Sequence, residues 1–135
     1  MGAKVFLPDG EPSLTGIALD VRVWNTGKPS RIVQWSLAVV PQGAMPIFAQ
    51  HTKMPNTLTA GGEKNSLALR ASDSLDDRTL TTDVGLEPLS DRILFYVPLE
   101  KEIAGAGRTL WDMTAEDLFQ QTVRSAQKVG DWISR

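Results

Sequence analysis

The side chains best suited to catalysis are few in this chain of 135 residues. His51 is the only histidine, so a Ser-His-Asp site would have to use it, and no Gly-x-Ser-x-Gly motif accompanies it. The chain has no cysteine, which removes thiolate nucleophiles and sulfur ligands for a metal. We therefore expect His51 to be a surface or turn residue, and we expect no catalytic site, no metal site and no cofactor.

One group of carboxylates has the oxygen chemistry that calcium prefers. Its members lie close together in the sequence: Asp73, Asp76, Asp77 and Asp83. An EF-hand loop needs acids at alternate positions, a central glycine and a closing glutamate, and this spacing provides none of that pattern. Helix capping and solvation are the favoured explanation, and weak calcium binding is the alternative.

A second group of carboxylates could act as a paired acid and base, as in glycoside hydrolysis. It consists of Asp112, Glu116 and Asp117. Asp112 and Glu116 would share the outward face of a strand, where solvated acids are usual, so we expect no catalysis there. The nearby segment 105–110 begins like a dinucleotide-binding loop but has Leu110 in place of the third glycine, and we expect a connecting loop.

We expect strands to position these side chains, because the clearest pattern in the sequence is the alternation of apolar and polar residues. In the run 16–25 the aliphatic residues share one parity: Ile17, Leu19, Val21 and Val23. Asp20 and Arg22 have the other parity, so the run predicts a strand with one buried face.

A second alternating run, 31–40, follows the turn residues of segment 25–30. The pattern places one set of side chains on a common buried face: Val33, Trp35, Leu37 and Val39. Two such runs joined by a short polar loop are most simply antiparallel neighbours.

The middle of the chain gives weaker signals. Segment 45–51 is predicted to be an edge strand, because Pro46 lacks an amide hydrogen. We expect short extended pieces at 57–59 and 65–70.

Two short helices are compatible with the remaining sequence. One or two turns fit within 72–82, with Ser74 as a cap.

Segment 91–98 predicts a strand covered on both faces. Segment 114–133 allows either a helix or a strand pair, and we favour the strands, with any helix confined to the tail 126–135.

About seven or eight short strands without βαβ alternation predict an all-β fold. We expect a single domain, residues 1–135, built as a two-layer antiparallel sandwich with residues 126–135 as a tail.

The block 18–37 resembles strands B and C of immunoglobulin-like domains. It contains an Asn-x-Gly-x-Pro loop at 25–29 followed by a strand with a tryptophan, Trp35, as in uncharacterised bacterial proteins. Trp35 would be the core tryptophan of strand C. The resemblance implies a non-catalytic module, often appended to a larger or membrane-tethered protein.

Two later segments extend the resemblance. Residues 86–95 are similar to the loop and strand F of such domains, and residues 116–123 are similar to their closing hairpin. Gln120 stands where a glycine is usual in that hairpin. The resemblance carries over no functional residues.

Trp24 is the one candidate binding residue. Its parity places it on the side of Asp20 and Arg22, away from the core. A loop or the segment bearing Trp132 is the favoured cover for it, and a binding patch is the alternative.

Charge and hydropathy exclude some classes of function. The chain has 14 basic and 16 acidic residues without a basic cluster, which disfavours nucleic-acid binding. No apolar run reaches the roughly 18 residues of a membrane span. The chain as given is expected to be soluble, and the exposed part of a membrane-anchored protein is one context that fits it.

The leading functional hypothesis is a non-catalytic interaction or accessory module that binds a protein partner or associates with itself. The alternative is a carbohydrate- or calcium-binding domain, or a small hydrolase, that uses loop carboxylates.

Overall fold

A computed structural model describes residues 3–8, 13–52, 57–60, 67–70 and 75–128. It consists mostly of antiparallel strands with two short helices, which confirms the all-β prediction. The elements follow in the order β1 (Ala3–Phe6), β2 (Thr15–Val23), β3 (Ile32–Val40), β4 (Ile47–Thr52), β5 (Thr57–Ala60), β6 (Leu67–Arg70), α1 (Leu75–Thr81), β7 (Leu89–Val97), α2 (Lys101–Ala104), β8 (Leu110–Asp117) and β9 (Thr122–Lys128).

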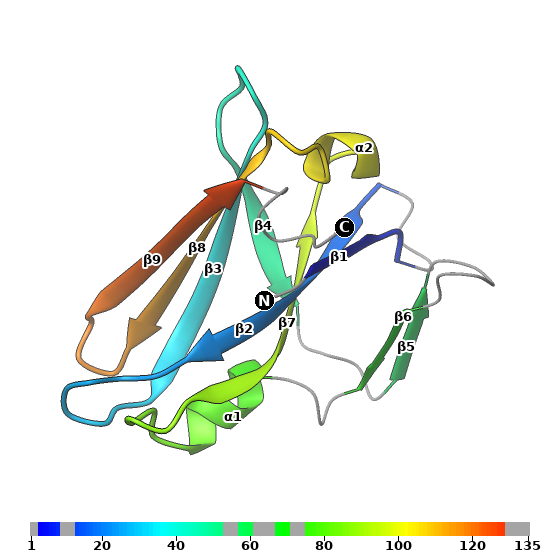
Figure 1. Ribbon diagram of the computed structural model, residues 1–135. Helices are drawn as coiled ribbons and strands as arrows, with labels where there is room; N and C mark the ends of the chain where they lie inside the picture. Colours follow the sequence, from blue (N-terminus) through cyan, green and yellow to red (C-terminus); the bar gives the residue numbers. More distant parts are fainter. Residues whose placement is uncertain (1–2, 9–12, 53–56, 61–66, 71–74, 129–135) are drawn as a thin grey trace.

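Seven strands form one curled sheet in the order β1-β2-β7-β4-β3-β8-β9, and β5 and β6 form a separate pair. Figure 1 shows β1, β2 and β7 on one side of β4, and β3, β8 and β9 on the other. The first part of β4, residues 47–49, pairs with β3, and the second part, residues 50–52, pairs with β7. The prediction of an edge strand at 45–51 is therefore wrong. Pro46 lies just before the strand, so its missing amide hydrogen does not interrupt the ladder.

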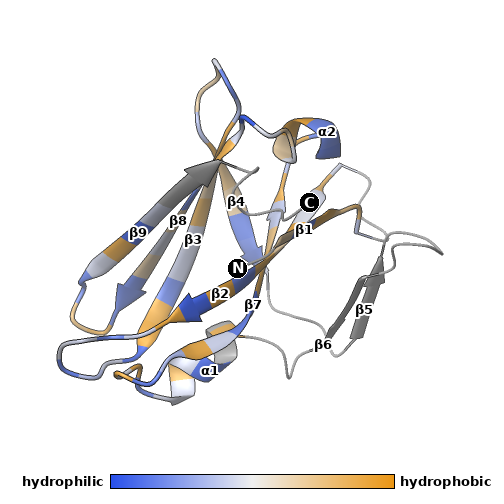
Figure 2. Ribbon diagram, in the orientation of Figure 1, coloured by the Kyte–Doolittle hydropathy of each residue, from blue (hydrophilic) through white to orange (hydrophobic). Residues whose placement is uncertain are grey.

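The alternation predicted for β2 is confirmed. Ile17 and Leu19 are fully buried and Val21 nearly so, whereas Asp20 and Arg22 are exposed. Figure 2 shows hydrophobic residues along most of β2 and hydrophilic ones towards the end near α1. In the neighbouring strand β7, the consecutive residues Ile93, Leu94 and Phe95 are fully buried, so this part of the strand is covered on both faces, as predicted for segment 91–98.

β2 and β3 are not neighbours, so the predicted hairpin is wrong. β2 pairs with β1 and β7, and β3 pairs with β4 and β8. The loop 24–31 carries the chain from one half of the sheet to the other. The two aliphatic rows contribute to one core, where Leu19 and Leu37 belong to the same buried cluster.

One residue of β3 differs from the predicted alternation. The register of β3 against β8 shifts between Ile32 and Gln34, which is a β-bulge. The extra residue reverses the parity before it, so Ile32 enters the core and Val33 is 43% exposed. Trp35 and the later residues of the row are buried as predicted.

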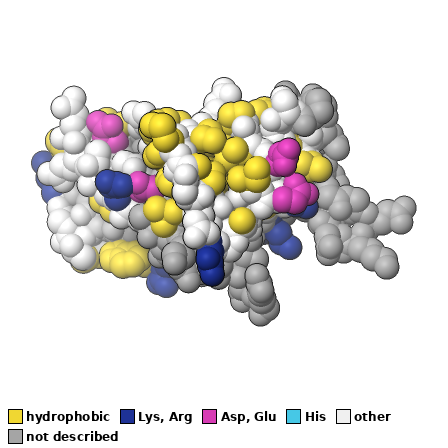
Figure 3. Space-filling model, turned by 90° about the horizontal axis from the view of Figure 1, so that it is seen from above, with side chains coloured by type: hydrophobic (Ala, Val, Ile, Leu, Met, Phe, Trp, Pro, Cys, Tyr) yellow, Lys and Arg dark blue, Asp and Glu magenta, His cyan; other side chains and the backbone are white. Residues whose placement is uncertain are grey.

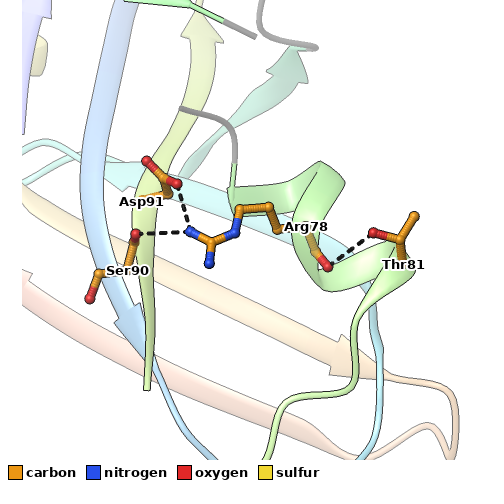
Figure 4. A network of polar contacts seen from close by, with 4 residues as sticks. All are labelled: Arg78, Thr81, Ser90 and Asp91. Atoms are coloured by element: carbon orange, nitrogen blue, oxygen red, sulfur yellow. Dashed lines mark hydrogen bonds and ion pairs between the residues drawn. The ribbon is translucent and has the colours of Figure 1, made fainter. Parts of the chain in front are cut away.

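Helix α1 lies where a short helix was predicted and closes one end of the core. The indole Nε1 of Trp35 donates a hydrogen bond to Thr79 Oγ1 at 3.3 Å. Figure 4 shows Arg78 reaching from α1 to β7, where it donates to the Asp91 carboxylate at 2.8 Å and to the Ser90 carbonyl at 3.3 Å. These contacts hold α1 against both halves of the sheet.

The C-terminal third forms the strand pair that the sequence favoured. β8 and β9 are antiparallel from the pair Leu110–Lys128 to the pair Glu116–Thr122. The short helix α2 was not predicted; the buried Trp111 side chain donates from Nε1 to the Ala104 carbonyl at its end, at 3.0 Å. The predicted cap Ser74 and the tail beyond 128 lie outside the described residues.

Candidate functional site

Three connections meet at one end of the sheet, beside α1 (Figure 1). They are the β2–β3 loop (24–31), the α1–β7 loop (82–88) and the β8–β9 turn (118–121). We call this region the loop end. Hydrogen bonds, described below, join the three connections to one another.

Backbone hydrogen bonds tie the β2–β3 loop to the α1–β7 loop. The amide of Asn25 donates to the Gly85 carbonyl at 2.8 Å. Ser30 and Val84 exchange two hydrogen bonds, of 3.3 and 2.7 Å, in an isolated antiparallel bridge. Paired backbone groups fix the path of both loops relative to each other.

The carboxylate of Asp117 organises the β8–β9 turn. Its Oδ1 accepts hydrogen bonds from the amides of Phe119 and Gln121, each at 2.9 Å. Its Oδ2 accepts a hydrogen bond of 3.2 Å from the Ser30 hydroxyl, which joins the turn to the β2–β3 loop. Gln120, the residue where a glycine is usual, has a φ of 62°, in the left-handed region.

Four large apolar side chains are exposed on these three connections: Trp24, Leu86, Leu118 and Phe119. We call them the loop-end surface. Trp24 is 56% exposed and Phe119 is 58% exposed, and the Lys28 ammonium lies 5.7 Å from the centre of the Phe119 ring. Large apolar side chains exposed together on neighbouring loops are a feature of interaction surfaces.

Sequence reasoning found Trp24 but missed the other three residues. The signal was present, because Leu118 and Phe119 are two adjacent apolar residues inside a turn, where polar residues are usual. The suggested cover for Trp24, the segment with Trp132, lies outside the described residues.

A groove of about 540 Å³ opens beside the loop end, between β2 and the β8–β9 pair. The residues at its floor are mostly buried and apolar: Val21, Ile32, Trp35 and Met113. Trp24 and Val123 lie among the exposed residues that line it. This volume is within the range of about 300–1,000 Å³ typical of ligand pockets.

The groove exposes side chains on the core-facing side of the sheet. Val123 is the partner of Ala115 in the β8–β9 register and so shares the core-facing side, yet it is 72% exposed. Within the described part of the chain, β1 covers the edge of β2 only from Gly16 to Leu19. The final residues of β2 and the start of β9 therefore face each other across the groove.

The carboxylates of β8 are engaged in structural contacts. Asp112 is paired with Arg124 of β9, from which it accepts two hydrogen bonds, one of them 3.2 Å from Nε. The hydrogen bond and the charge of Asp112 raise the pKa of the Arg124 guanidinium above its usual value. Asp117 holds the turn, as described above, and Glu116 is half-buried.

The other candidate residues do not converge on a site. Asp83 forms an ion pair with Arg31 at 3.4 Å, both side chains being largely exposed. Asp76 and Asp77 lie in α1, and Asp73 lies outside the described residues. In the part of the chain that is described, no three His, Cys, Asp or Glu residues are arranged to hold a metal ion.

His51 is exposed, as expected, and its ring centre lies 5.6 Å from that of Phe95. None of the helices that the structure describes has the length and hydropathy needed to cross a membrane.

The opposite end of the molecule also has exposed hydrophobic side chains. Figure 3 views that end and shows hydrophobic side chains gathered there, with acidic groups on both sides of them. Met45, in the β3–β4 loop, is 82% exposed, and Ile103 of α2 is partly exposed. Among the described residues, no hydrogen bond ties that loop to α2, in contrast to the loop end.

No family model matches the chain, and no curated protein or solved structure gives a significant match. The loop end and the groove are therefore the features from which a function is inferred.

Proposed function

We propose that this chain is a non-catalytic, immunoglobulin-like module that binds a protein partner through its loop end. The order of the strands supports the proposal. The row β1-β2-β7-β4 follows the order A-B-E-D of immunoglobulin sheets, and the row β3-β8-β9 follows C-F-G. In this order β7 is the counterpart of strand E, so residues 86–95, which the sequence resemblance likened to strand F, correspond to strand E instead. The buried Trp35 lies on β3, the counterpart of strand C.

The loop end occupies a position that immunoglobulin-like domains use for recognition. The β2–β3 loop and the β8–β9 turn correspond to the B–C and F–G loops, which carry the binding residues of antibody variable domains. Loops on a rigid scaffold are a frequent location for binding residues.

The observation that carries the proposal is the exposure of four large apolar side chains on three loops that are bonded to one another. Tryptophan is enriched among the residues that dominate binding energy. Because the loops are already fixed by the Ser30–Val84 bridge and by Asp117, little conformational entropy is lost on binding.

The environments of the carboxylates support a non-catalytic role. The carboxylate of Asp112 already accepts hydrogen bonds from Arg124, and that of Asp117 accepts them from turn amides. Binding of a carbohydrate or of calcium, or hydrolysis by loop carboxylates, stays a prediction that titration with glycans and with Ca²⁺ would test.

Photo-crosslinking tests the proposed surface directly. Benzoylphenylalanine in place of Phe119 should give a defined protein adduct in the cells that make this protein. The same group in place of Phe48, which is 77% exposed on β4, is the matched control and should give none. Equal adducts at the two positions, or none at Phe119, would contradict the proposal.

A substitution then measures the contribution of the surface. Trp24→Ala should weaken the association with the crosslinked partner, or with a second copy, by about tenfold or more, a loss of about 1.4 kcal/mol. The melting temperature should be unchanged, because the side chain is largely exposed. A large fall in melting temperature would show that Trp24 packs within the monomer instead.

A further inference from the structure

The groove between β2 and β9 has a geometry that the loop-end surface does not explain. We propose that it accepts an extended segment of another protein as an additional strand on the free edge of β9, with aliphatic side chains at alternate positions and carboxylates between them. The inference builds on the proposed interaction role and concerns a neighbouring surface, which shares Trp24 with the loop-end surface.

The first observation is the free edge itself. β9 spans seven residues, Thr122–Lys128, and pairs only with β8 in the described part of the chain. Natural edge strands are usually protected by a proline, a bulge or an inward-pointing charge. β9 has no proline, its register with β8 is regular, and its core-facing positions in the groove are Val123 and Ser125. Its outer backbone groups are thus available to a further strand.

The second observation is the apolar space beside that edge. Side chains alternate along a strand, so every second residue of an added strand would point into the groove. There it would lie next to Val123, which is core-facing but exposed, and opposite Val21 of β2, which is nearly buried. Aliphatic side chains at alternate positions would complete the packing that β9 leaves open.

The third observation is the charge around the groove. Arg22 is exposed, lines the groove from β2, and has no ion-pair partner among the described residues. Arg124 lies on the outward face of β9, where it is paired with Asp112 but is still 69% exposed, so it can meet a second carboxylate. Asp117 also lines the groove, and its oxygens already accept hydrogen bonds from Ser30 and from the turn amides. Intervening residues of an added strand would lie beside Arg124 and close to the rim, so carboxylates there are favoured by charge complementarity.

Calorimetric titration with a designed peptide tests this inference. The probe is a nine-residue peptide of alternating valine and glutamate with both ends blocked, at a pH where the glutamates are ionised. It should bind saturably. A peptide of the same composition with its valines in one block, and one of alternating valine and lysine, should bind at least about tenfold more weakly.

Variants of the protein locate the binding. Val123→Lys should weaken binding of the peptide by about tenfold or more, since it places a cation in the apolar groove. Val33→Lys is the matched control, because Val33 is an exposed strand valine outside the groove, and it should leave the affinity unchanged. Equal effects of the two substitutions would overturn the assignment to the groove.

Backbone methylation distinguishes strand addition from simple apolar binding. In an extended peptide the amides of the valines and of the glutamates point to opposite sides. Methylation of one set should abolish binding, and methylation of the other should spare it. Loss with both sets or with neither would overturn the edge pairing, and absence of binding by the parent peptide would overturn the inference as a whole. A protein that crosslinks through Phe119 but ignores the peptide would retain the proposed function and lose only this inference.

Discussion

Asp117→Ala is expected to destabilise the protein and to loosen the loop-end surface at the same time. The substitution removes three acceptor contacts, to the amides of Phe119 and Gln121 and to the Ser30 hydroxyl. A hydrogen bond contributes about 0.5–1.5 kcal/mol to stability, and two of these three are exposed, so we expect a total loss of about 1.5–3 kcal/mol. The matched variant Asp117→Asn keeps one acceptor oxygen and should lose about 1 kcal/mol or less.

Urea unfolding followed by tryptophan fluorescence measures the loss, and hydrogen exchange of the Phe119 and Gln121 amides locates it. In Asp117→Ala these amides should exchange at least about tenfold faster. The exchange rate of the β7 amides should rise only by the amount that the loss of global stability explains. The reasoning would be refuted if Asp117→Ala were as stable as the parent, or if the two turn amides kept their protection.

Two further predictions concern single backbone positions. Gln120→Gly should raise the free energy of unfolding by about 0.5–1 kcal/mol, because Gln120 has a φ of 62° and glycine adopts this conformation without a steric cost. Urea unfolding measures the change, and a fall in stability would contradict the prediction. Gly16→Ala should lower it by about 1–3 kcal/mol, because the added methyl would lie 2.4 Å from the ring of Phe6. The same change in a Phe6→Ala background should cost nothing, and a similar cost in both backgrounds would show that the ring is not the cause.

The alternation of apolar residues was sufficient to predict most strands, because a two-residue period reports directly which face is buried. β2 was predicted for this reason, and so was the C-terminal strand pair in place of a helix. β7 was predicted instead from a continuous apolar run, which is typical of a strand covered on both faces. Helix α1 was predicted from its acids and its possible cap, which are local signals.

The wrong predictions share one cause, which is the pairing of strands that lie far apart in the sequence. The burial of Ile32 in place of Val33 depends on a bulge against β8, some 80 positions away in the chain, and nothing local marks it. The separation of β2 from β3 likewise depends on the partners that each strand finds elsewhere. Pro46 suggested an edge because a proline one residue outside a strand is indistinguishable, in sequence, from one inside it.

The candidate site was predicted only in part. Trp24 followed from parity alone, since its neighbours of the same parity are charged. The groove could not be predicted, because its lining comes from β2, β3, β8, β9 and the adjoining loops, so it depends on how these segments pack and not on any one of them. The turn residues Leu118 and Phe119 needed the Asp117 contacts to become recognisable as part of a surface.

The double pairing of β4 has a mechanical consequence. Hydrogen bonds join the two halves of the sheet along β4, whereas the side where β2 faces β9 has an apolar groove between them. The backbone ladder therefore joins the two halves at β4, whereas on the groove side they are held by side-chain packing in the core and by the hydrogen bonds of the loop end. A ligand that moved the halves apart at the groove would strain residues 47–52, so a spectroscopic label on β4 would report occupancy of the groove without contacting it.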